Sequence, residues 1–149
     1  MKELRNLIQR LPVLVVGALL FTHPARADQT CHRINTKGQG QVHFDTNSSD
    51  GEIVGGGLLH GTTHGDFRFT GPGTYEGTFT ITTMQGTLIL HLFNGVFDTG
   101  TGQFSNDSVV IDGTGRFEDA TGGLFFEGVV APDGSYTDRI TGQICVDLP

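Results

Sequence analysis

The sequence predicts an all-β protein, a closed antiparallel barrel of eight strands, with a β-sandwich as the alternative. Three observations lead to this fold class. Glycine is abundant, with 23 residues among 149, about twice its usual share. Several segments alternate apolar and polar residues with a period of two, which is typical of half-buried strands. No stretch after residue 27 spaces its apolar residues as a helix does over three turns.

A secretory signal peptide is expected in residues 1–27. A basic start precedes an apolar run from Leu11 to Phe21, and the small-residue site Ala25-Arg26-Ala27 follows it. The run is 11 residues long, whereas a helix needs about 20 to cross a bilayer. We therefore expect cleavage near Asp28, no membrane anchor afterwards, and a single secreted or periplasmic domain over residues 28–149.

The charge of this domain argues against a nucleic-acid partner. Four of the 9 basic residues and one of the 16 acidic residues lie in the leader, which leaves 5 basic and 15 acidic residues and a net charge of −10. A field of this sign repels phosphate backbones and anionic lipid headgroups.

Eight segments carry the strand pattern. Tyr75, Phe79 and Ile81 share one face of such a segment, and threonines occupy the other face. Turn signals separate the segments, for example at residues 47–51 and 132–134. The predicted strands, in chain order, are Gln41 to Phe44, Ile53 to Leu59, Asp66 to Thr70, Tyr75 to Thr82, Thr87 to Phe97, Ser108 to Asp112, Gly123 to Ala131 and Ser135 to Val146.

Two cysteines remain after cleavage, Cys31 near the start of the domain and Cys145 near its end. In an oxidising compartment they are expected to form a disulfide. Such a bridge would hold the first and last strands side by side.

Two predicted strands are apolar on both faces. Leu88 to Phe93 interrupts the alternation, and so does Leu124 to Phe126. A strand of this kind needs cover on its outer side. We therefore expect a homo-oligomer, formed through the strand Thr87 to Phe97 or the strand Gly123 to Ala131.

Polar residues that interrupt apolar strand faces are the candidate ligand-binding residues. Burying such a group unpaired costs about 1 to 3 kcal/mol, so a ligand or a structural partner must compensate. Asp138 shares a face with Ile140 and Ile144, and a desolvated carboxylate there could act as an acid or base. The alternatives for each candidate are a structural hydrogen bond, an interface position or exposure near a strand end. The candidates are His91, Asn94, Glu127, Tyr136 and Asp138, of which Asp138 is also the catalytic candidate.

Three motifs are better explained as ordinary turns and strands. His60 and His64 lie four residues apart, about 13 Å along a strand, and no further ligand completes a zinc set. Residues 45–51 resemble the start of a calcium loop but lack its final glutamate. Asp98-Thr99-Gly100 resembles the turn of dimeric aspartic proteases, although Thr101 replaces the expected small residue. We expect no metal and no cofactor.

The stretch Val110-Ile111-Asp112-Gly113-Thr114-Gly115-Arg116-Phe117-Glu118-Asp119-Ala120-Thr121-Gly122-Gly123 resembles the strand, Gly-Thr-Gly-Arg-Phe turn and small-residue loop of allene oxide cyclase-like and dirigent-like barrels. The resemblance implies an eight-stranded barrel around an apolar cavity, often assembled as a trimer. In those families such barrels cyclise an oxidised fatty acid or guide phenoxy-radical coupling. No motif carries the catalytic residues of either family onto this chain.

Together these observations predict an exported barrel that binds a small apolar ligand or guides its cyclisation without a cofactor. The alternative is a noncatalytic secreted or envelope protein that uses the same scaffold for interactions or structure. The residue pattern does not choose between an enzyme and a binding protein.

Overall fold

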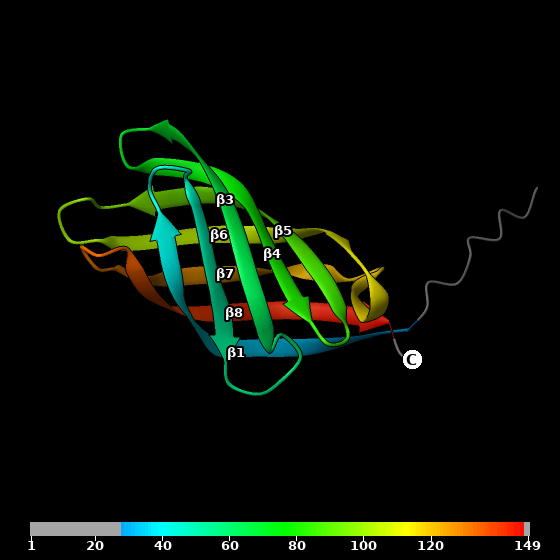
Figure 1. The fold of residues 1–149 in the computed structure, drawn as a ribbon. Coiled ribbons are helices and arrows are strands. Elements are labelled where there is room, and N and C mark those ends of the chain that lie inside the picture. Colours follow the sequence, from blue (N-terminus) through cyan, green and yellow to red (C-terminus); the bar gives the residue numbers. More distant parts are fainter. Residues whose placement is uncertain (1–27, 148–149) are drawn as a thin grey trace, which may run out of the picture.

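The computed structural model describes residues 28–147, so the predicted leader, residues 1–27, lies outside the described residues. Each strand pairs antiparallel with the next one along the chain, and β8 returns to pair with β1, which closes the barrel (Figure 1). The predicted barrel is therefore confirmed, and the sandwich alternative is excluded. The elements are β1 (Gln29–His43), β2 (Ser48–Val54), β3 (Gly61–Gly71), β4 (Thr74–Thr83), β5 (Gly86–Phe97), β6 (Gln103–Gly113), the 3-10 helix η1 (Gly115–Phe117), β7 (Thr121–Val130) and β8 (Ser135–Asp147).

All eight predicted strands overlap observed strands, but several boundaries differ, most of all the start of β1 and the end of β2. β1 begins 12 residues before Gln41, because it pairs with β8 from Gln29 onwards. β2 ends at Val54, and the predicted extension to Leu59 is wrong. Gly55 and Gly57 have φ angles of 113° and 115°, which only glycine adopts readily, so they form a loop. The turn predicted at residues 47–51 lies at residues 44–47.

The predicted disulfide is present. Cys31 on β1 and Cys145 on β8 are bonded, with Cα atoms 3.9 Å apart, and they are direct partners in the β1–β8 register. The bond therefore fastens the first strand to the last at the seam where the barrel closes.

One half of the barrel is filled with side chains. This packed half includes the end at which β1 begins, β8 ends and η1 lies (Figure 1). Phe117 of η1 is fully buried there. The other buried members of this core are mostly branched aliphatic residues, among them Ile34, Ile53, Leu59, Ile81, Leu88, Leu90, Leu124, Ile140, Ile144 and Val146. Removing this apolar surface from water is the main source of the barrel's stability.

Between Asp28 and Asp147 the chain contains no helix long and apolar enough to cross a membrane.

Candidate ligand-binding cavity

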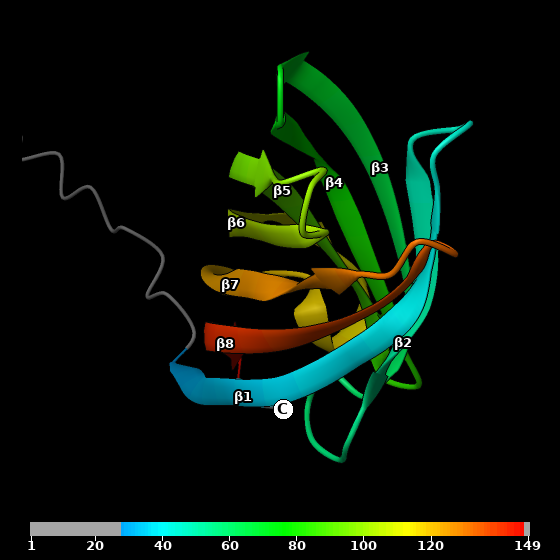
Figure 2. The same ribbon diagram turned by 90° about the vertical axis from the view of Figure 1, so that its left-hand side faces the viewer.

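The opposite half of the barrel is open. Here the hairpins β1–β2, β3–β4, β5–β6 and β7–β8 surround a cavity, and Figure 2 shows the barrel from this side. The space in it that is open to water-sized molecules has a volume of about 80 Å³. Most of its wall is aromatic: Phe44, Phe67, Phe69, Tyr75, Phe79, Phe97, Phe104, Phe126 and Tyr136. We call this part of the barrel the open half.

The register of β8 directs two predicted site residues into the cavity. Tyr136, Asp138 and Ile140 are buried, whereas Thr137 and Arg139 between them are exposed. Successive side chains of a strand point to opposite faces, so the three buried residues share the interior face. Asp138 is only 9% exposed. It thus lies inside the barrel, as its alternation with apolar neighbours predicts.

Glycines in the neighbouring strands make room for these side chains. Gly38 on β1 lies opposite Asp138, and a Cβ atom at position 38 would stand 2.4 Å from Oδ1 of the carboxylate. A Cβ atom at Gly51 would likewise stand 2.4 Å from the Tyr136 hydroxyl. Both distances are far below van der Waals contact, so the glycines are needed to fit Tyr136 and Asp138 into the barrel.

Asp138 is a buried carboxylate without a partner at one of its oxygens. Its Oδ1 atom is shielded from solvent and accepts no hydrogen bond. Burial raises the pKa of Asp138 from 3.8 to about 6, and a hydrogen bond from the Gly38 backbone opposes part of this rise. The wall of the cavity contains no lysine, arginine or histidine. Asp138 can therefore accept a hydrogen bond from a bound molecule or transfer a proton near neutral pH.

Two tyrosines in the wall have fixed hydroxyl groups. The Tyr75 hydroxyl donates a hydrogen bond to Oδ1 of Asn106 at 2.8 Å. Burial raises the pKa of Tyr75, and the charge of Asp138 raises it further. Burial also raises the pKa of Tyr136, which a hydrogen bond with Thr63 partly offsets. Both hydroxyls therefore stay protonated and supply polar contacts within an apolar wall.

Sequence reasoning missed Tyr75 and Asn106 as site residues. The alternation predicts that Tyr75 shares a strand face with Phe79. It does not show that this face lies in the same cavity as Asp138, because that depends on how the barrel closes. Asn106 lies on β6, whose predicted start at Ser108 was too late. The alternation of Phe104, Asn106 and Ser108, which line the interior of β6, was a signal that could have extended this strand.

Two exposed aromatic side chains of the cavity wall, Phe44 and Phe69, extend it to solvent. Phe44 is 53% exposed and Phe69 is 47% exposed. The ring of Phe44 lies 6.3 Å from that of Phe97, and the ring of Phe69 lies 6.4 Å from that of Tyr75, between centroids. The apolar wall thus continues outward to solvent as an aromatic rim.

The other three predicted site residues lie outside the cavity. His91 is half-buried on the outer face and stacks on Phe93, with ring centroids 6.1 Å apart. Asn94 is exposed and donates a hydrogen bond to Asp107 at 3.1 Å. Glu127 is exposed on β7. Because β5 and β7 are apolar on both faces, alternation alone could not tell which face would turn inward.

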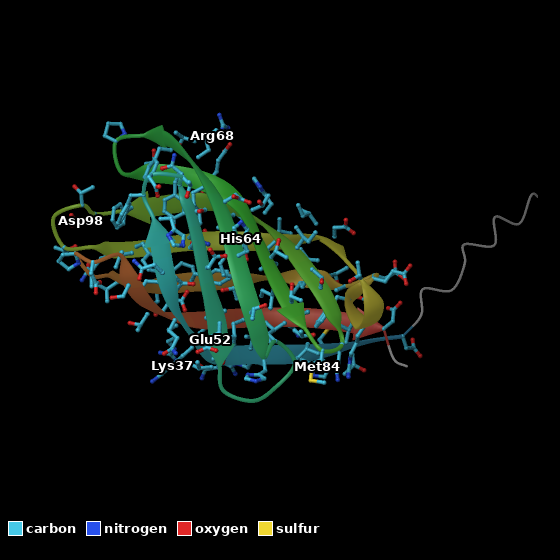
Figure 3. The ribbon with its side chains drawn as sticks, viewed as in Figure 1. Lys37, Glu52, His64, Arg68, Met84 and Asp98 are labelled. Carbon is cyan, nitrogen blue, oxygen red and sulfur yellow. A yellow bond between two sulfur atoms is a disulfide. The ribbon has the colours of Figure 1, made fainter. Side chains whose placement is uncertain are left out.

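The two histidines of the possible zinc motif contact different parts of the protein. Nδ1 of His60 lies 3.1 Å from the carbonyl oxygen of Ile53. His64 lies on the outer face of β3 (Figure 3), where its Nδ1 is 2.7 Å from Asp50. This hydrogen bond raises the pKa of His64. No group of three or more histidine, cysteine, aspartate or glutamate residues in 28–147 is arranged to hold a metal ion.

Asp98, of the protease-like turn, stabilises its own hairpin. It lies in the β5–β6 loop (Figure 3), and its Oδ1 accepts a hydrogen bond from the Gly100 backbone at 2.8 Å. This bond lowers the pKa of Asp98, and contacts with Thr101 lower it further. The motif therefore acts as a turn in this fold.

No protein-family model and no curated protein matches the chain. Among solved structures, that of a pterocarpan synthase dirigent protein is similar, with a TM-score of 0.38 and 13% identity over 94% of this chain and 99% of the other. The strand pairing itself establishes the closed eight-stranded barrel. This is the architecture that the resemblance to dirigent-like barrels implies.

Proposed function

We propose that this protein binds a small apolar ligand in the open half of the barrel, with Asp138 as the polar contact of the ligand. The observation that carries the proposal is the buried carboxylate of Asp138, which lines an aromatic cavity that opens to solvent and has one oxygen without a partner. Leaving such an oxygen unpaired costs about 1 to 3 kcal/mol. An apolar pocket with a few convergent polar groups is typical of small-molecule sites.

The same site could guide a cofactor-free cyclisation of the bound ligand. A carboxyl whose pKa is about 6 can both accept and donate a proton near neutral pH. The aromatic wall would hold the ligand in one conformation and exclude water. Binding is the function that the geometry supports best, and in a reaction Asp138 would be the proton-transfer group.

Ligand-observed saturation-transfer NMR with 2-phenylethanol, a small neutral probe, tests the proposal. Val130 lines the cavity, whereas its neighbour Val129 is 45% exposed on the outer face. We expect Val130→Trp to fill the cavity and abolish the signal, and Val129→Trp to leave it unchanged. No binding by the wild-type protein, or equal binding by both variants, would contradict the proposal.

We also propose that the protein forms a homo-oligomer, with a trimer favoured by the family resemblance. β6 lies between β5 and β7, so it joins the two predicted interface strands into one outer face. Val109 and Ile111 on β6 are 43% and 56% exposed, and Phe125 on β7 is 37% exposed. Adjacent exposed apolar side chains of this kind favour a contact with another chain.

Light scattering at micromolar concentration tests the assembly. Ile111→Asp should dissociate the oligomer because it places a charge in the interface. Met84→Asp is the matched control, since Met84 is fully exposed in the β4–β5 turn. A wild-type monomer would contradict the assembly.

We further propose that the protein is exported to the periplasm or secreted. A disulfide across the barrel seam supports an oxidising compartment. The alternative function, a noncatalytic interaction or structural protein on this scaffold, would use the apolar outer face and leave the cavity without a ligand.

A further inference from the structure

The negative charge inside the cavity has no positively charged counterpart in the part of the cavity wall that residues 28–147 form. Asp138 is its only charged wall residue, and all five basic residues of the domain are exposed on the outside. Its Oδ1 is both buried and unpaired. A buried carboxylate is stable only when it is paired or protonated. Within residues 28–147 no basic side chain lies in the cavity wall, so the ionised form of Asp138 is left for a bound cation to neutralise.

The wall around Asp138 is suited to a cation. Tyr75 and Phe67 contact edge to face, with ring centroids 5.8 Å apart, and Tyr136 and Phe104 do the same at 6.3 Å. Aromatic faces carry negative partial charge and attract ammonium groups, most strongly where water is excluded. The wall therefore offers π-electron surface and a carboxylate, with no basic group to compete for them.

The loops at the entrance of the cavity are negatively charged, as is Asp138 in its wall. The loops of the open half contain Asp45, Asp98 and Asp133, all of them exposed, and residues 44–47, 72–73, 98–102 and 131–134 include no lysine or arginine. Arg68, on the neighbouring β3 strand, is paired with Glu76. An acidic entrance concentrates cations and repels anions.

We infer that the cavity binds an organic cation, a small apolar molecule with a protonated amine whose N–H donates to the carboxylate of Asp138. This inference rests on the proposed function and specifies its ligand class. A neutral hydroxyl could supply the hydrogen bond but would leave the negative charge of Asp138 uncompensated. A carboxylate ligand would add a second buried negative charge and is excluded by repulsion.

Calorimetric titration with three probes of one shape tests the inference at pH 7.5. The probes are 2-phenylethylamine, 2-phenylethanol and 3-phenylpropionate. We expect the amine to bind about tenfold more tightly than the alcohol, because a hydrogen bond between charged groups is stronger than one to a neutral donor. The acid should not bind.

Two variants and a change of pH test whether Asp138 causes the preference for the amine over the alcohol. Asp138→Asn should bind amine and alcohol equally, whereas Asp112→Asn, a change at an exposed position on β6, should keep the preference. At pH 5 the amine should lose about tenfold in affinity, because Asp138, with a pKa of about 6, is then mostly protonated. Alcohol affinity should change less.

The failures of the two proposals are distinguishable. If alcohol and amine bind the wild-type protein equally, or if Asp138→Asn keeps the amine preference while folded by circular dichroism, the cation inference is overturned and the cavity remains a binding site. If none of the three probes binds, the proposed function fails, and the cation inference fails with it.

Discussion

The packed half and the open half are built from the same eight strands, yet their side chains differ in kind. In the packed half, branched aliphatic residues such as Ile81 and Ile144 are fully buried around Phe117. In the open half, aromatic residues and Asp138 surround a cavity. The comparison teaches that stability and binding are separated along the barrel. A well-packed end supplies the free energy that lets the other end keep an unpaired carboxylate.

The largest expected loss of stability follows from removing the Phe117 ring in the packed half. Phe44 in the open half is the comparison. Phe117→Ala should lower the free energy of unfolding by about 3 to 5 kcal/mol, because it leaves a hole in a core that cannot collapse. Phe44 is 53% exposed, so Phe44→Ala should cost less than about 1 kcal/mol. Urea unfolding measures both. If both variants lost the same free energy of unfolding, the packed half would not be the main source of the barrel's stability.

The next effect concerns the seam at the packed end. Replacing Cys31 and Cys145 together by serine should lower the free energy of unfolding by about 2 to 4 kcal/mol, because the bridge closes a loop of 114 residues in the unfolded chain. Affinity for 2-phenylethanol should be unchanged while the protein is folded. A variant as stable as the wild type would show that strand pairing alone secures the seam.

Asp138, in the open half, should make the free energy of unfolding of the protein depend on pH. Its pKa is about 6 in the folded protein and 3.8 when unperturbed, so between these values the folded state binds more protons than the unfolded state. The free energy of unfolding should therefore fall by at most about 3 kcal/mol as pH rises from 4 to 6.

Thermal unfolding of wild type and Asp138→Asn across this pH range isolates the effect. The variant should be the more stable protein at pH 7.5, and its advantage should vanish at pH 4. Asp112→Asn is the control for a general change in charge. A variant less stable than the wild type at pH 7.5 would mean that Asp138 has a structural partner in solution.

The smallest effect should follow from a single methyl group. Gly38→Ala places a Cβ atom 2.4 Å from Oδ1 of Asp138, whereas Gly56 has open space around it. Gly38→Ala should cost about 1 to 3 kcal/mol of stability and reduce probe binding by displacing the carboxylate. Gly56→Ala should change neither. Unaltered binding by Gly38→Ala would place the ligand away from Asp138.

Much of the fold followed from local pattern. Alternation located several of the strands, because a half-buried strand needs apolar residues on one face only, and short apolar runs between turn signals located the others. The two cysteines predicted their own bridge, since no other pairing existed. Asp138 was predicted to face inward because the opposite face of β8, with Thr137 and Arg139, is clearly polar.

The remaining features depended on barrel closure. β5 and β7 are apolar on both sides, so only packing in three dimensions could place His91 and Glu127 outside. Tyr75, Asn106 and Asp138 come from three different strands, and no local pattern relates them. Nor does composition reveal that Oδ1 of Asp138 lacks a partner. By itself, the sequence determined where the strands lie and which face of β8 is polar, because these depend on neighbours along the chain. It also determined the disulfide, because the chain has only two cysteines. The tertiary structure alone decided which face turned inward and which groups met there, because those depend on register around a closed ring.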